Sequence, residues 1–567
     1  MKIFNKIWKA VFVLSLVFSI ESQACTNILV SKGASKDGST MITYAADAHV
    51  LYGELYHWPA ADWSTGTMLD VYEWDTSKFL GKIEQVAHTY NVVGNMNEHQ
   101  VAIGETTFTG RSELKDSTAI IDYGSLIYIT LQRAKNAREA IKVMSDLVEK
   151  YGYYSTGESF SISDKNEVWI LEMISKGMKE KGAVWVARKI PEGYISGHAN
   201  QARITTFPQG GKKSISCDEF DRLYDKKVEN IYSHDVISFA KKQGYYEGKD
   251  KDFDFSAAYA PLDFGAARFC DARVYSAFLK VDEKMDKYED YVMGDIEKKR
   301  MPLWIKVKDK LSVQDVMELM RDHFEGTPMD MTADIGAGPS KLPYRWRGLT
   351  WEYDGEKYCN ERAISTQQTG FSFVTQSRSW LPDAVGGIIW FGLDDTYSTV
   401  YTPVYTSSTK IAPSMQVGNG SMVEYSETSA FWTFNRVTNF AYMRYDLIIE
   451  DVRKEQNRLE SKFVQLVPAI DKAASELYKS NPELAVEYLS DFSVDNAEKM
   501  VAAWKDLDKY LLVKYLDGNV KKEENGSFKL NEYGYPASPN FPGYSEEWRK
   551  RVVEDAGKKL KMPAAAH

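Results

Sequence analysis

Histidine and cysteine are scarce in this chain, which limits the metal chemistry available to it. The 567 residues include eight His and four Cys, with no H-x-x-x-H or C-x-x-C pair among them. Zinc centres are built mainly from such pairs. We therefore expect no metal centre and no cofactor, although the acidic residues leave a carboxylate site for a hard cation open.

A block of basic residues is also missing. The 70 Lys and Arg are outnumbered by 80 Asp and Glu, and the formal net charge is -10. Proteins that bind nucleic acid need clustered positive charge to neutralise phosphates, so we expect no nucleic-acid partner. Hydrophobic residues make up 44% of the chain, which is enough for a globular protein with a large core.

Long apolar runs are absent except near the N-terminus, where three lysines precede the largely apolar residues 10–20. This run spans roughly 16 Å as a helix, about half of a bilayer core, so we expect no permanent membrane span. The small residues Ser22 and Ala24 stand just before Cys25, as in a signal peptide cleaved after Ala24. The sequence therefore predicts an exported protein, periplasmic or extracellular, that begins with Cys25.

Two other roles for Cys25 stay open. The first is lipid attachment in a lipoprotein, but Ser22 stands where such proteins usually have Leu, and a strand-like T-N-I-L-V follows directly. A lipid anchor is therefore the less favoured form of export. The second is a disulfide with Cys217, Cys270 or Cys359, whose redox state the sequence leaves undetermined.

A cysteine at the first position of a mature chain carries a nucleophile and a base in one residue. Its free α-amine, with an unperturbed pKa of about 7.7 to 8.0, can accept the thiol proton without a histidine. The thiolate can then attack an amide carbonyl, and the ammonium can protonate the leaving amine. Cleavage before Cys25 thus predicts an amide hydrolase, and a peptide bond at that nitrogen would abolish the base.

A turn signal places a carboxylate near this predicted N-terminus. Two β-prone stretches flank Asp37-Gly38, and Asp-Gly is a strong hairpin signal. With the turn there, residues 44–48 return alongside residues 25–29. Asp47 would then lie where a carboxylate can hold an ammonium. The alternative is a surface aspartate at a strand end.

Five motifs follow one another along the chain. They are C-T-N-I-L-V-S-K-G-A-S-K-D-G-S-T from Cys25, N-E-H-Q-V-A-I-G-E-T-T from Asn97, H-A-N-Q-A-R-I from His198, E-G-T-P-M-D-M-T from Glu325 and N-E-R-A-I-S-T-Q-Q-T from Asn360. Together they resemble the N-terminal cysteine dipeptidases. This family belongs to the N-terminal nucleophile (Ntn) hydrolases and is distantly related to the choloylglycine (bile-salt) hydrolases and the penicillin V acylases.

The resemblance implies roles for five residues. Cys25 is the nucleophile and Asp47 contacts its amine. Asn200 donates its side-chain amide to the oxyanion, with Thr107 as a second contributor, and a fixed neutral donor suits that task. A turn or capping role is the alternative for Asn200. Arg362 corresponds to the active-site arginine of the wider superfamily, with a buried structural ion pair as an equally good interpretation.

One position departs from the related bile-salt hydrolases. They have an arginine three residues before the aspartate, near the thiol, whereas this chain has Tyr44. A phenol cannot lower a thiol pKa as a guanidinium does. Arg203, three residues after Asn200, is the candidate for the missing cation.

The hydrophobic patterning predicts an α+β fold. We expect strands near 91–95, 101–107, 159–163, 168–174 and 183–190, and helices near 124–134 and 137–150. A further β-prone block covers 372–405, with Trp380, Trp390 and Phe391 as core aromatics. By resemblance, these elements form a four-layer αββα sandwich with Cys25 at the end of an inner strand.

Apolar residues recur at helical spacing from about residue 428. We therefore divide the chain into a signal peptide (1–24), an Ntn-hydrolase catalytic domain (25–425) and a helical C-terminal extension packed on the core (426–567). No repeat or low-complexity tract stands out.

The resulting prediction is an exported cysteine dipeptidase that cleaves short peptides with a free amino terminus. An acylase acting on conjugated bile acids or on amides like penicillin V is the alternative within enzymes. A noncatalytic surface lipoprotein is the alternative from another class. The expected partner is a small peptide substrate, and a homo-oligomer remains open.

Overall fold

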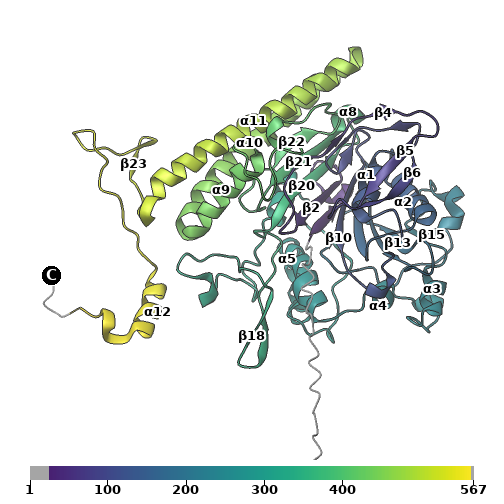
Figure 1. Cartoon of the computed structure of the whole chain (residues 1–567), viewed down its shortest axis with the longest axis horizontal. Coiled ribbons are helices and arrows are strands. Elements are labelled where there is room, and N and C mark those ends of the chain that lie inside the picture. The colour runs from purple at the N-terminus through teal and green to yellow at the C-terminus, as the bar shows by residue number, and fades with distance from the viewer. Residues whose placement is uncertain (1–24, 563–567) are drawn as a thin grey trace, which may run out of the picture.

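Two large sheets form the centre of the structure (Figure 1). The computed structural model describes residues 25–562, and the predicted signal peptide lies outside them. One sheet has seven strands and the other has nine. Of the strand pairs described within them, only β15 with β16 is parallel, and the others are antiparallel.

The order of the strands across each sheet differs from their order along the chain. From edge to edge, the seven-stranded sheet contains β17 (Trp304–Lys306), β14 (Tyr194–His198), β1 (Asn27–Val30), β2 (Met41–Asp47), β20 (Thr369–Ser377), β21 (Gly387–Leu393) and β22 (Thr402–Tyr405). The nine-stranded sheet contains β15 (Ser214–Ser216), β16 (Asn230–Tyr232), β13 (Ala183–Lys189), β12 (Val168–Ser175), β11 (Glu158–Ser163), β10 (Ala102–Thr107), β9 (Met96–Asn97), β8 (Val92–Val93) and β3 (His57–Trp58).

The predicted hairpin at the start of the described chain is confirmed. Strands β1 and β2 pair antiparallel, and a further bridge joins Thr26 to Ala45. Gly38 takes φ +82° in the turn, a conformation that L side chains rarely adopt, and the Asp37 carboxylate accepts the Ser39 backbone N–H at 3.0 Å. This register brings Asp47 back to Cys25, the first residue that the structure describes.

The two sheets pack face to face. Strand β2 of the seven-stranded sheet contacts β10 and β11 of the nine-stranded sheet. Leu29 and Ile42 from one sheet share a buried cluster with Ala102 and Ile170 from the other. The start of β1, the end of β2 and the end of β10 therefore lie at the same end of the two packed sheets. Cys25, Asp47 and Thr107 lie there.

Helices α1 (Tyr123–Leu131) and α2 (Ala137–Tyr151) cover the other face of the nine-stranded sheet. Both match the predicted helices. Asp122 and Asn136 cap their N-termini by accepting backbone N–H groups of the first turn. Their apolar faces pack on Phe160, Trp169 and Leu171 of the sheet.

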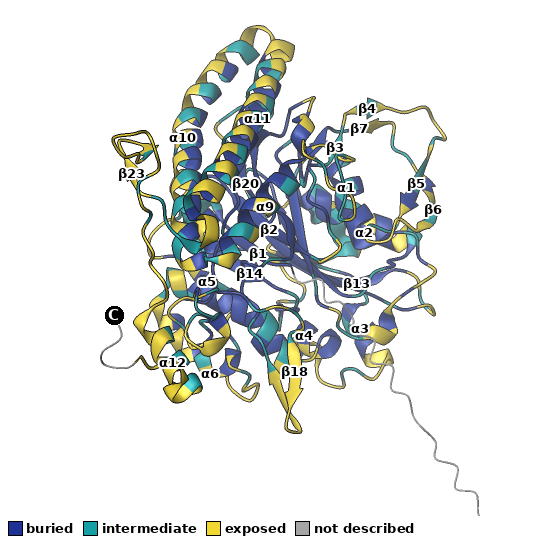
Figure 2. Cartoon of the chain, turned by 60° about the vertical axis from the view of Figure 1, so that its left-hand side comes forward, coloured by how far each residue is buried: buried dark blue, intermediate teal, exposed yellow. Residues whose placement is uncertain are grey.

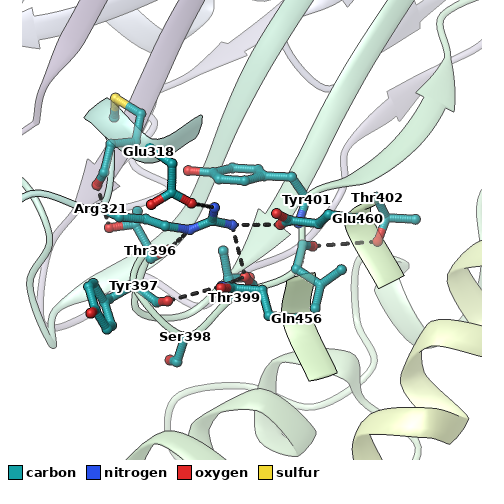
Figure 3. A network of polar contacts seen from close by, with 12 residues as sticks. Glu318, Arg321, Thr396, Tyr397, Ser398, Thr399, Tyr401, Thr402, Gln456 and Glu460 are labelled. Atoms are coloured by element: carbon teal, nitrogen blue, oxygen red, sulfur yellow. Dashed lines mark hydrogen bonds and ion pairs between the residues drawn. The ribbon is translucent and has the colours of Figure 1, made fainter. Parts of the chain in front are cut away.

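The C-terminal part is helical and packs on the seven-stranded sheet. Helix α9 (Ala430–Met443) precedes the long hairpin of α10 (Tyr445–Ser480) and α11 (Pro482–Tyr515), whose sheet-facing side is buried (Figure 2). Buried charges fix this contact: Arg321 donates to Glu460 of α10 at 2.6 Å (Figure 3). Residues 516–562 run outside the core and include α12 (Glu546–Ala556).

The coarse prediction is confirmed as a mixed α/β structure with several sheets and a helical C-terminal part. Trp390 and Phe391 are buried as predicted, but the prediction for Trp380 is wrong, because 51% of it is exposed. It lies in the turn after β20 and not in a strand. Within residues 25–562, no helix is both long enough and apolar enough to cross a bilayer.

Candidate active site

Cys25 lies immediately before β1, with 3% of its surface exposed. Its backbone carbonyl accepts a hydrogen bond from Arg273 Nη1 at 2.6 Å. Its Sγ lies 3.7 Å from the Tyr44 hydroxyl and 3.8 Å from Glu105 Oε1. The thiol is thus enclosed by polar groups from β2 and β10 while the main chain of the same residue is held by an arginine.

Asp47 ends β2 next to Cys25, as the sequence predicts. A register shift between Ala46 and Asp47 interrupts the pairing with β20, and such irregularities turn a side chain toward a site. The carboxylate accepts hydrogen bonds from Arg362 Nη2 at 2.5 Å and Thr369 Oγ1 at 2.6 Å. Burial raises the pKa of Asp47, while the Arg362 charge opposes that rise.

Of the two interpretations that the sequence left open for Arg362, the structure shows the buried ion pair. The partner in this pair, Asp47, is the carboxylate beside Cys25. The position of Arg362 makes it a positioning residue for that carboxylate. Its role in catalysis stays a prediction.

Asn200 and Thr107 lie together, and Arg273 links Asn200 to Cys25. Asn200 follows β14 with φ +65°, a left-handed conformation that asparagine tolerates better than most residues. Its Nδ2 donates to the Thr107 carbonyl at 2.6 Å. The Thr107 hydroxyl in turn donates to Glu158 Oε1 at 2.9 Å. The two proposed oxyanion contributors are therefore neighbours, and their contribution to an oxyanion stays a prediction.

Arg273 is the cation that sequence reasoning missed. It belongs to α5 (Ala272–Val281), a segment for which the sequence motifs predict no role, and its Nη2 donates to Asn200 Oδ1 at 2.8 Å. One guanidinium thus links Cys25 to Asn200. Burial and the neighbouring Arg362 lower the pKa of Arg273 to about 10, so it remains charged at neutral pH.

The prediction for Arg203 is wrong. This arginine donates to the Gly197 and Pro302 carbonyls, each at 2.7 Å, and lies 3.4 Å from Asp271. Those bonds join the backbone at Gly197 to the backbone at Pro302 and do not involve Cys25. No local pattern distinguishes Arg273 from Arg203, because tertiary packing alone decides which of them reaches Cys25.

Two buried glutamates add negative charge around the thiol. Glu105 accepts the Tyr44 hydroxyl at 2.5 Å, and Glu105 and Glu158 each have a second carboxylate oxygen without a hydrogen-bond partner. Burial raises the pKa of Glu105 to about 7, and burial together with Glu105 raises the pKa of Glu158. The pair therefore favours a shared proton over two full charges.

These surroundings do not activate the thiol by themselves. Burial raises the pKa of the Cys25 thiol, and the charges of Glu105 and Asp47 raise it further. Among residues 25–562, no histidine contacts Cys25. The buried His198 ring pairs instead with Thr106 and Ser161, and burial lowers its pKa to about 3. The nucleophile therefore needs a base of another kind.

Two cavities adjoin the site, and Cys25 lines the first of them. The first, which we call the aromatic cavity, measures about 200 Å³, and its wall includes Cys25, Tyr44, Tyr56, Trp58, Trp74 and Tyr128. The second, the polar cavity, measures about 800 Å³, and its wall includes Thr107, Lys115, Glu158, Asn200, Arg273 and Arg362. Asp75 and Tyr123 line both. The site therefore offers one apolar compartment and one charged compartment to a substrate.

One group of potential metal ligands occurs elsewhere in the described chain. Donor atoms of Cys217, Asp218 and His234 lie within 4.8 Å of one another near the surface. The His234 backbone N–H donates to the Cys217 sulfur at 3.3 Å. None of the three lines either cavity, so the chemistry at Cys25 does not involve them.

Replacing Arg273 with lysine is expected to lower kcat/KM on a cleaved substrate by about 10- to 100-fold. A lysine keeps the charge but cannot bond the Cys25 carbonyl and Asn200 Oδ1 together in a planar fork. Arg203→Lys is the matched control, because that arginine is equally buried but bonds neither group. Steady-state kinetics on samples with the same fraction of folded protein measure the effect. Loss of activity in Arg203→Lys with full activity in Arg273→Lys would contradict the assignment.

Comparison with known proteins identifies relatives along most of the chain. Residues 52–458 match the sequence profile of Peptidase family C69. A "Probable dipeptidase" from Salmonella dublin is 26% identical over 406 residues, which cover 67% of this chain and 81% of that protein. A "Probable dipeptidase" from Latilactobacillus sakei is 24% identical over 521 residues, 87% of this chain and 98% of that protein. A "Probable dipeptidase B" from Streptococcus pyogenes serotype M1 is 23% identical over 534 residues, which cover 90% of this chain and 97% of that protein.

Proposed function

Since the chain belongs to Peptidase family C69, a family of Ntn-type cysteine peptidases that hydrolyse peptide bonds, we propose that it is an exported dipeptidase whose nucleophile is Cys25. The resemblance inferred from the motifs is thereby confirmed at the level of the family. The proposal adds the substrate length, the mechanism and the destination of the protein.

The observation that carries the mechanism is the setting of the Cys25 sulfur. It opens on a cavity, burial and two carboxylates raise its pKa, and no described histidine contacts it. A thiol in such a setting reacts only if a nearby base removes its proton. The α-amine of Cys25 itself supplies that base once residues 1–24 are removed, and the Asp47 carboxylate holds the resulting ammonium.

The remaining residues act on the developing charges. The thiolate attacks the scissile carbonyl, and the Asn200 amide and the Thr107 region stabilise the oxyanion. The ammonium of Cys25 then protonates the leaving amine, and water releases the acyl group from the sulfur. Arg273 and Arg362 keep Asn200 and Asp47 in place through the bonds described above.

The proposal also covers the finer architecture and the location. The facing sheets, with α1 and α2 outside one and α9 to α11 outside the other, support a four-layer αββα sandwich. The charged start and apolar run before Cys25 support export to the periplasm or the exterior. A diacylglyceryl anchor would be bonded to the Cys25 sulfur, which would block the nucleophile and is incompatible with this mechanism.

Two measurements test the proposal. Intact-mass analysis of the exported protein is expected to show a chain that begins with an unmodified Cys25, whereas a diacylglyceryl adduct would indicate the lipoprotein. Dipeptides are expected to be hydrolysed, and a conjugated bile acid and penicillin V are not. Cleavage of the last two compounds, but not of dipeptides, would identify an acylase. Absence of any turnover would contradict an enzymatic role.

A further inference from the structure

The aromatic cavity is built for one large apolar side chain. Its rings touch one another: Trp58 stacks on Tyr128 with centroids 4.9 Å apart, and Tyr56 lies 4.8 Å from Trp74. A dry cavity of about 150 Å³ already accepts benzene, so about 200 Å³ accommodates an aromatic or branched side chain. Because Cys25 is part of this wall, the side chain that enters belongs to a residue next to the scissile bond.

Asp75 marks the position of a substrate amine. It is the carboxylate that lines both cavities, and the Tyr123 hydroxyl fixes it by donating to Oδ1 at 2.7 Å. No lysine or arginine among residues 25–562 forms an ion pair with it. The other candidates are engaged, since Glu54 accepts the Gly418 N–H and Asp47 pairs with Arg362. Beside Asp75, Glu158 lines the polar cavity, but its carboxyl group is already paired with Glu105.

These two features fix the orientation of a dipeptide. In the N-terminal residue, the ammonium and the side chain leave the same Cα, so an ammonium at Asp75 directs that side chain into the aromatic cavity. The carboxylate of the C-terminal residue then lies in the polar cavity, whose wall carries Arg273 and Arg362. The reverse orientation would bring the carboxylate against Asp75, whose charge would repel it.

We infer that the enzyme selects dipeptides whose N-terminal residue is aromatic or large and aliphatic, with Asp75 binding the ammonium and the aromatic cavity binding the side chain. This inference rests on the proposed dipeptidase function. It adds a substrate class and a recognition residue to it. Burying such a side chain is worth about 10- to 100-fold in specificity relative to alanine.

The first test compares Phe-Ala, Ala-Phe and Ala-Ala on the mature wild-type enzyme. We expect kcat/KM for Phe-Ala to exceed that for each of the other two by about 10-fold or more. If all three dipeptides are cleaved and kcat/KM for Ala-Phe equals or exceeds that for Phe-Ala, this inference is wrong and the dipeptidase function still holds. Failure to cleave any dipeptide would overturn the proposed function and this inference with it.

The second test isolates the ammonium. The des-amino substrate 3-phenylpropanoyl-alanine lacks that group and is otherwise like Phe-Ala. We expect Asp75→Asn to raise KM for Phe-Ala by about 10-fold or more, with little change in kcat, and to abolish the preference for Phe-Ala over the des-amino compound. Glu73→Gln removes the same charge two residues away, outside the aromatic cavity, and is expected to keep the preference. The opposite result for the two variants would overturn the assignment of Asp75.

The third test concerns the side chain. Trp58→Ala removes one wall of the cavity, so kcat/KM for Phe-Ala is expected to fall by about 10-fold or more while that for Ala-Ala stays within a few-fold. An equal loss on both substrates would mean that Trp58 serves the fold alone and would contradict the cavity assignment. Melting temperatures of all variants establish that the comparison is made on folded protein.

Discussion

Replacement of Cys25 by alanine is expected to abolish dipeptide hydrolysis and to leave the fold intact. Removing a nucleophile typically costs a hydrolase several orders of magnitude in kcat, and we expect a loss of about 10⁴-fold or more. Stability should change little, because the change removes one sulfur atom whose side-chain hydrogen bonds, to Tyr44 and Glu105, are long at 3.7 and 3.8 Å. Steady-state kinetics and thermal unfolding measure the two effects.

Cys270 provides the matched control for this experiment. It also lines the polar cavity, but burial raises the pKa of its thiol to about 11, and no proton acceptor is assigned to it. Cys270→Ala should therefore retain activity close to that of the wild type. Retained turnover in Cys25→Ala, or complete loss in Cys270→Ala alone, would refute the choice of nucleophile.

The parts of the site that could be predicted are those fixed by local chain geometry. The antiparallel pairing of β1 with β2, across the loop that contains Asp37-Gly38, brings Asp47 to Cys25. The helices α1 and α2 and the strands β10 to β13 follow from periodicity for the same reason. Each depends on contacts between residues close in sequence.

The parts that could not be predicted depend on packing between distant segments. Arg273 reaches Cys25 across 248 positions of sequence, and nothing around it differs from the surroundings of other helical arginines. Glu105 lies inside a recognised motif, but its approach to Glu158 appears only when β10 pairs with β11. Asp75 likewise becomes recognisable only through the cavities that it joins.

Retention of a residue ahead of Cys25 is expected to cause the second large loss of activity. A chain that retains Ala24 ahead of Cys25 has an amide nitrogen where the base should be. We therefore expect kcat/KM to fall by about 10³-fold or more relative to a chain that begins with Cys25, since general-base catalysis typically contributes 10²- to 10⁴-fold. Burial and the charges of Glu105 and Asp47 already raise the thiol pKa, so spontaneous ionisation cannot replace the base.

An added residue could also act by filling the cavity beside Cys25, and the pH dependence separates the two causes. With the amine as base, kcat/KM of the mature form should rise with pH until the amine, whose unperturbed pKa is about 7.7 to 8.0, is neutral. The rate at which a small alkylating reagent modifies Cys25 should follow the same rise, and the extended form should lack it. An extended chain that keeps this pH profile and is merely slower would indicate steric blockage. An extended or N-blocked chain that hydrolyses dipeptides at the full rate would contradict the mechanism, because its sulfur would then have lost its proton to some other group.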